Sequence, residues 1–251
     1  METTNENIRI DITENGTTTL ATAGKYCDRN IDVNADKVYE AGQQSEYDRF
    51  WDAAQLDEDG NLRTYLNYHF AGRAWTEENF KPKYDIRPGG TATGLFRETQ
   101  ITNLKQCLES SGVTLDTSKM TSGTGAFGYG QLTILPKLDF SSLTGATNTF
   151  TNSGQLHTIE EMVVSESTTF VSTTFTSCTA LTRLIMTGTL AKNGLDLHWS
   201  TLLDRESLLS ILNVLQNKTS GTWTVTLGSE NLAKLTDAEK AIATQKGWTL
   251  L

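Results

Sequence analysis

The sequence contains few of the residues that mark disulfide-rich or metal-binding proteins. Its 251 residues include only 3 cysteines, 3 histidines and 3 prolines. Cys27, Cys107 and Cys178 are odd in number and far apart, which is typical of reduced, buried thiols in a protein folded in the cytosol. No two histidines have the spacing of metal ligands, so we expect no metal site.

Positive charge and long apolar runs are also scarce. The chain has 21 Lys and Arg against 30 Asp and Glu, a net charge of −9. Nucleic-acid binding needs a basic face, so we expect no nucleic-acid partner. No run approaches the roughly 18 apolar residues of a membrane span. The N-terminal METTNENIRIDITENG lacks the charged-then-apolar start of a secretory signal, and we expect no membrane insertion.

A repeat of about 25 residues organises the middle of the chain. Leu132, Leu156 and Leu181 each begin a similar line of sequence, at steps of 24 and 25 residues. Each line continues with short apolar pairs, the third of them Leu184 with Ile185, and with Ser/Thr-rich tracts. A fixed period of this size predicts a solenoid, in which stacked units bury the apolar face that one unit cannot bury alone.

Phenylalanines extend this pattern towards the N-terminus. They lie 26, 31, 23 and 25 residues apart, at Phe70, Phe96, Phe127, Phe150 and Phe175. Because stacking makes one position internal in every unit, we predict that these side chains are core. The longest interval contains LKQCLESSG (104–112), which predicts a short helical insertion on one face of the repeats.

The repeat resembles a known family. Phe175, Cys178, Leu181 and Leu184 fit the pattern F-x-x-C-x-x-L-x-x-L of the bacterial surface-antigen (BspA-like) leucine-rich repeats. Other units depart from the pattern, with Ser153 or Gly130 in place of the cysteine. The resemblance covers residues 70–190. It implies a right-handed stack of strand-plus-irregular units used for binding and not for chemistry.

The N-terminal segment carries a second resemblance. Ile8, Ile10 and Ile12 alternate with polar residues, which predicts a strand, and ENG (14–16) predicts a turn before short strands at 17–21 and 31–33. Residues 12–34 resemble a short module of structural and tail-associated proteins from phages of Gram-positive bacteria. The alternative is an ordinary β-meander that caps the repeats.

Four regions follow from these patterns: an N-terminal β attachment module (1–35), a helical cap (36–69), the leucine-rich-repeat solenoid (70–200) and a C-terminal α/β cap (201–251). The first cap contains a helix expected at 36–56. The second contains a helix after Asp204, a strand at 222–227, a capping box at Thr236 and Glu239 before a helix at 237–245, and a strand at 248–251. The predicted fold class is an α+β solenoid of degenerate repeats.

The sequence gives only weak signals for a catalytic or ligand-binding site. The run Gly123–Gly128 matches G-x-G-x-x-G but lacks the following helix of a dinucleotide site. DEDG (57–60) is typical of a solvated turn, because it lacks the closing ligands of a calcium loop. No Ser or Cys nucleophile has a recognisable context. We therefore expect no enzyme and no cofactor; the alternative is a depolymerase whose carboxylates, distant in sequence, meet in a groove.

The resemblances predict a non-enzymatic bacteriophage virion protein, in the tail or decorating the particle, that attaches to a host surface. Its expected partners are other virion proteins through the N-terminal module, a host surface protein or glycan, and further copies of itself. The alternatives are a purely structural virion component and a bacterial surface adhesin. Since strand side chains alternate between faces, the predicted binding face comprises the displayed residues His157, Glu160, Glu161, Thr182, Arg183 and Thr187.

Overall fold

The computed structural model describes residues 8–14, 17–23 and 66–251. Strands β1 (Ile8–Glu14) and β2 (Thr17–Ala23) pair antiparallel, with Ile8 opposite Ala23 and Glu14 opposite Thr17. This confirms the two strands predicted around the turn. The strand predicted at 31–33, the helix predicted at 36–56 and the turn predicted at 57–60 lie outside the described residues.

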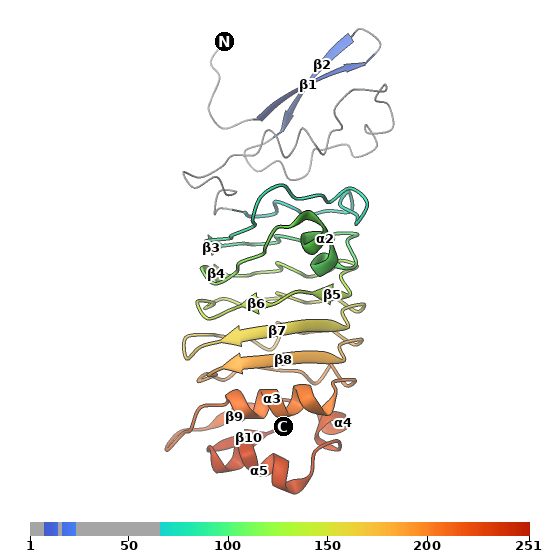
Figure 1. Cartoon of the computed structure of the whole chain (residues 1–251). Helices are drawn as coiled ribbons and strands as arrows, with labels where there is room; N and C mark the ends of the chain where they lie inside the picture. The colour runs from blue at the N-terminus through green and yellow to red at the C-terminus, as the bar shows by residue number, and fades with distance from the viewer. Residues whose placement is uncertain (1–7, 15–16, 24–65) are drawn as a thin grey trace.

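Residues 66–251 form one elongated stack of coils, each about one repeat long (Figure 1). Strands β5 (Ile134–Leu135) and β6 (Leu138–Asp139) both pair parallel with β7 (Thr158–Val164), which pairs parallel with β8 (Arg183–Gly188). Strands β3 (Gly90–Thr91) and β4 (Met120–Ser122) make an earlier parallel pair. Pairing therefore joins each coil to the next at the spacing of the sequence repeat.

The repeated phenylalanines form a column of stacked rings inside the coils. Neighbouring ring centroids lie 5.1, 6.0, 5.6 and 4.9 Å apart from Phe70 to Phe175, with interplanar angles between 14° and 23°. All five side chains are fully buried. The backbone N–H of Phe127 also donates to Thr149 of the next coil at 2.8 Å. The prediction that these residues are core is confirmed.

The chain turns sharply just after each phenylalanine. The residue two positions on has a positive φ in every case: Gly72, Glu98, Tyr129, Asn152 and Ser177. Only one of these is a glycine, although positive φ is unfavourable for other residues. Inter-coil hydrogen bonds offset that cost: the N–H of Tyr129 donates to Thr151 and that of Asn152 to Thr176, both at 2.9 Å.

Small polar side chains fill the interior beside the turns. Ser153 Oγ donates to the carbonyl of Phe127 at 2.9 Å, and Cys178 Sγ to that of Phe150 at 3.1 Å. Burial raises the pKa of the Cys178 thiol to about 12, so the group stays protonated. Cys107 is also a buried free thiol, as predicted; Cys27 lies outside the described residues.

The insertion is a helix, as predicted. Helix α2 (Leu104–Ser111) begins after Asn103, whose side chain accepts from the N–H of Gln106, and ends at Gly112, which has φ +67°. The glycine-rich run contributes to the contact between coils. A Cβ at Gly128 would lie 2.9 Å from the carbonyl of Thr151, so glycine lets adjacent coils approach closely.

The C-terminal coils use helices where the middle coils use strands. After β8 come α3 (Arg205–Val214), β9 (Trp223–Val225), α4 (Ser229–Leu232), α5 (Asp237–Gln245) and β10 (Trp248–Leu250). Strands β9 and β10 pair parallel, with Trp223 opposite Trp248. Thr236 and Glu239 form the predicted capping box, and Asp204 caps α3. The predicted elements of this region are confirmed.

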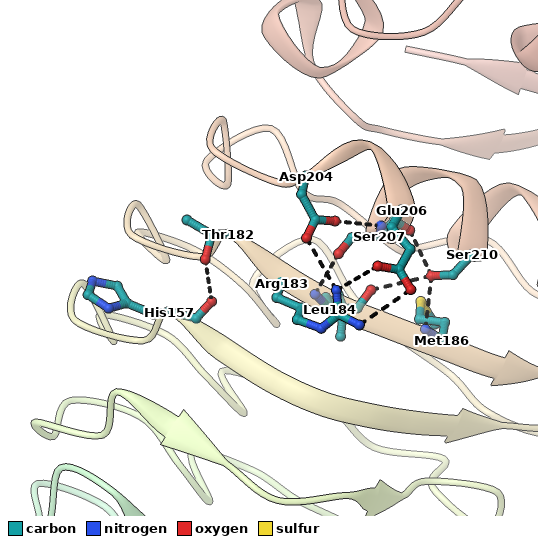
Figure 2. Close-up of polar contacts among 9 residues, drawn as sticks. All are labelled: His157, Thr182, Arg183, Leu184, Met186, Asp204, Glu206, Ser207 and Ser210. Carbon is teal, nitrogen blue, oxygen red and sulfur yellow. Dashed lines mark hydrogen bonds and ion pairs between the residues drawn. The ribbon is translucent and has the colours of Figure 1, made fainter.

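Helix α3 covers the free edge of β8 through two serine hydroxyls (Figure 2). Ser207 Oγ accepts from the N–H of Leu184 at 2.9 Å, and Ser210 Oγ accepts from the N–H of Met186 at 3.0 Å. These are the donors that another strand would pair. An uncovered edge would leave them unsatisfied and open to pairing with another chain.

Replacing Ser207 by alanine is expected to lower the free energy of unfolding by about 1–3 kcal/mol, because the Leu184 N–H then stays buried without an acceptor. Urea denaturation measures the change. Ser110→Ala is the matched control, because Ser110 is an exposed serine on α2. Equal losses in both variants would contradict a role for the hydroxyl at the strand edge.

Candidate functional site

Four of the six residues predicted to form a binding face, Glu160, Glu161, Arg183 and Thr187, lie on β7 and β8, and the other two immediately precede these strands. The β7–β8 register shifts between Ile159 and Met162, so Glu160 and Glu161 are both partly exposed. Met162 and Val164, the apolar pair of β7, are both buried. In β8 the buried pair is Leu184 and Met186. Ile185, which follows Leu184 in the apolar pair of the sequence, is only half-buried, because strand alternation turns it away from the core.

Glu160 joins the strands to the helical insertion. The Nζ of Lys105, in α2, lies 2.6 Å from Glu160 Oε1 and 3.6 Å from Glu109 Oε1. The hydrogen bond to Glu160 raises the pKa of Lys105, so the ammonium is charged at neutral pH. The contact spans 55 residues of sequence, and it ties one side of α2 to β7.

Glu161 bridges three successive coils. Its carboxylate accepts from Thr187 Oγ1 at 2.8 Å and lies 3.0 Å from Lys137 Nζ. The hydrogen bond from Thr187, followed by that from Lys137, holds the pKa of Glu161 below its ordinary value. Three coils therefore contribute side chains to one polar cluster. It lies on the surface formed by the six predicted binding residues, which we call the strand face.

Arg183 connects the same face to the N-terminal end of α3 (Figure 2). Its Nη1 lies 2.8 Å from Glu206 Oε2 and 3.4 Å from Asp204 Oδ2. His157 and Thr182 are exposed immediately before β7 and β8. Thr182 Oγ1 donates to the carbonyl of His157 at 3.0 Å, so this hydroxyl also joins two coils.

The strand face is thus a surface of ion pairs. Each of its three charged residues is matched by an opposite charge in the same chain. Exposed pairs of this kind contribute about 0–1 kcal/mol each, so they align coils more than they stabilise them. The two glutamate carboxylates contact lysine ammonium groups and a threonine hydroxyl of other coils. This arrangement suits a structural role better than acid–base catalysis.

No family model, curated protein or solved structure matches this chain. Among the residues that the structure describes, no three His, Cys, Asp or Glu side chains gather as metal ligands would. No helix in the same described ranges has both the length and the apolar character of a membrane span.

A second surface runs along the positions just after the buried phenylalanines and, in the last coil, after Leu197. The sequence patterns did not identify it. We call it the phenylalanine edge and define it by one residue from each of five successive coils: Glu98, Tyr129, Asn152, Ser177 and Trp199. Tyr129 is 36% and Trp199 43% exposed, whereas the aromatic rings of the phenylalanine column are fully buried. One sequence signal could have identified this surface: Tyr129 lies two residues after Phe127, and Trp199 lies two residues after Leu197.

Charge separates the two surfaces. Residues 140–159 and 167–182 contain no Asp, Glu, Lys or Arg. They supply Asn152 and Ser177 to the phenylalanine edge. The ion pairs of the strand face come from the segments between and around these tracts. The stack therefore displays one charged and one largely uncharged surface.

Acid is expected to weaken the polar cluster around Glu161. Its folded-state pKa is lowered from 4.5, so the stabilisation is complete above pH 4.5 and is lost as the pH falls through the folded pKa. The free energy of unfolding of Glu161→Gln should therefore fall less between pH 7 and pH 3 than that of the native chain. Glu78→Gln, at an exposed carboxylate, is the control. An equal acid response in the native chain and Glu161→Gln would contradict the linkage.

Proposed function

We propose that this protein is a non-enzymatic bacteriophage virion protein whose degenerate leucine-rich-repeat solenoid attaches to a host surface. The two sequence resemblances support the phage context and the repeat type. The N-terminal hairpin β1–β2 belongs to the proposed attachment module, which binds other virion proteins. The coils from residue 70 onward are the displayed part.

The observation that carries the proposal is the shared register at the beginning of strands β5, β7 and β8. Leu135, Ile159 and Leu184 align inside, while Ile134, Thr158 and Arg183 align outside. Equivalent side chains therefore form straight columns on a scaffold held by parallel backbone pairing and a continuous core. A surface ordered before binding avoids much of the entropic cost of ordering side chains and loops at an interface.

The proposal is tested with the purified full chain on susceptible Gram-positive host cells. Saturable binding is expected, and Glu160→Ala combined with Arg183→Ala should weaken it if the strand face is the contact. Asp237→Ala, an exposed charge on α5, is the matched control. Absence of cell binding by the native chain would refute adhesion. Unchanged binding by the double variant, with an intact fold, would exclude the strand face.

One observation favours the structural alternative, in which the stack makes contacts between virion subunits. In the described residues β10 is paired on one side only, with β9, and Leu251 beside it is 54% exposed. An unpaired strand edge is a template for a second chain. Light scattering of the native chain and of Leu251→Asp would separate a monomeric adhesin from a subunit that associates through this edge.

A further inference from the structure

We propose that the phenylalanine edge binds an uncharged polysaccharide lying along the axis of the stack. This inference rests on the proposed adhesion function and deepens it, since it names the ligand class and places the contact away from the ion-paired strand face. It is carried by the charge, the exposed aromatics and the alignment of the edge, which are independent observations.

The edge offers hydrogen bonds without net charge at its centre. Asn152 is exposed, and its side-chain amide presents both a donor and an acceptor; Ser177, partly exposed, adds a hydroxyl. The tracts that contain these residues carry no Asp, Glu, Lys or Arg. A surface of this kind matches a ligand rich in hydroxyl groups. It gives no counter-charge to an anionic polymer or a nucleic acid, both of which the chain's net charge of −9 repels.

Two exposed aromatic side chains border the polar centre. Tyr129 and Trp199 present large apolar rings to solvent, where they contribute little to the core. Aromatic rings combine a large apolar surface with a polar end, so they suit ligands that have both characters, such as the apolar CH face and hydroxyl rim of a pyranose. The Arg97 guanidinium lies 4.5 Å from the centroid of the Tyr129 ring and helps to fix it.

The backbone places these side chains in one row. The N–H of Tyr129 donates to Thr151, that of Asn152 donates to Thr176, and Ser200 Oγ donates to the carbonyl of Cys178 at 3.2 Å. Tyr129, Asn152, Ser177 and Trp199 consequently come from four successive coils. At about 4.8 Å per coil, the two aromatics are about 14 Å apart along the axis. An extended chain of a few sugar residues spans that distance, whereas one monosaccharide does not.

A polar pair supports the Trp199 end of the row. His198 Nδ1 lies 2.6 Å from Asp196 Oδ1, and the His198 ring lies 5.0 Å from that of Trp199. In the neutral imidazole, donation from Nδ1 to the carboxylate leaves Nε2 as an acceptor. The exposed imidazole can therefore accept a hydrogen bond from a ligand hydroxyl beside the indole.

Affinity electrophoresis of the full chain tests the inference. The probes are dextran, mannan, galactan and the neutral cell-wall polysaccharide of a susceptible host, with polygalacturonate as the anionic comparison. We expect retardation by at least one neutral probe and none by polygalacturonate. Trp199→Ala and Tyr129→Ala should each weaken binding about tenfold, because each removes one stacking contact, and Tyr129→Phe, which keeps the ring, should retain it. The matched control is Leu202→Ala, at a non-aromatic side chain of the same coil that is 56% exposed.

Three results would overturn the inference: no retardation by any neutral probe, stronger retardation by polygalacturonate, or equal weakening in Leu202→Ala and Trp199→Ala. Whole-cell binding separates this failure from failure of the adhesion proposal. If the native chain binds cells and neither Tyr129→Ala nor Trp199→Ala changes that binding, the site is refuted and the adhesion proposal stands. Retardation by a neutral probe that depends on the two aromatics supports the site even where the native chain does not bind cells.

Discussion

Replacing Phe150 by alanine is expected to lower the free energy of unfolding by about 3–5 kcal/mol, because it opens a cavity in the phenylalanine column. The ring is fully buried between Phe127, at 5.6 Å, and Phe175, at 4.9 Å, and it also packs 6.1 Å from Phe140. Stacked coils share stability through their interfaces, so the loss should extend to both neighbours. Thermal and urea unfolding measure the total effect, and hydrogen exchange locates it.

The control for this substitution is Tyr129→Ala, which removes an aromatic ring from the outside of the adjoining coil. Because Tyr129 is exposed, its loss should cost far less stability. A melting temperature unchanged by Phe150→Ala, or lowered equally by both substitutions, would show that the ring column does not hold the coils together.

Gly188→Ala is expected to be comparably severe, at more than about 3 kcal/mol, because it combines backbone strain with a steric clash. Gly188 ends β8 with φ +94° and pairs with Val164. A Cβ there would lie 2.0 Å from the Val164 carbonyl oxygen, which is backbone and cannot rotate away. Relief would require β7 and β8 to separate at that point, and urea denaturation measures the cost.

Gly112→Ala separates the two causes. Gly112 has φ +67°, but a Cβ there would meet nothing within 4 Å. The left-handed conformation alone should cost about 1–2 kcal/mol. If both alanine variants lose the same stability, the close approach of β8 to β7 does not constrain Gly188, and the clash argument is wrong.

The two surfaces of the stack have different consequences for function. On the strand face, ligand binding would have to compete with ion pairs such as Arg183 with Glu206. On the phenylalanine edge, a ligand would cover exposed aromatic surface and break no ion pair other than by displacing Arg97 from Glu98. Binding at the edge would therefore cost less energy, and we give the edge precedence as the contact in the adhesion proposal.

The sequence by itself determined the core and the local elements. The phenylalanine spacing identified the internal column, since a position buried in one stacked unit is buried in all. The bounds of α5 and its capping box also followed from sequence, because Thr236 and Glu239 satisfy backbone groups within one turn. Signals of this kind lie within a few residues or repeat at a fixed period, so they need no knowledge of the fold.

Only the tertiary structure decided which side chains meet across coils. Lys105 contacts Glu160, 55 residues away, because α2 packs against β5, which pairs with β7. The register shift after Ile159 exposes two consecutive glutamates. Tyr129 adopts a positive φ because a hydrogen bond to the next coil offsets the local cost. Each outcome depends on the alignment of one coil on its neighbour. That alignment is set by packing the whole core at once, and no stretch of sequence encodes it alone.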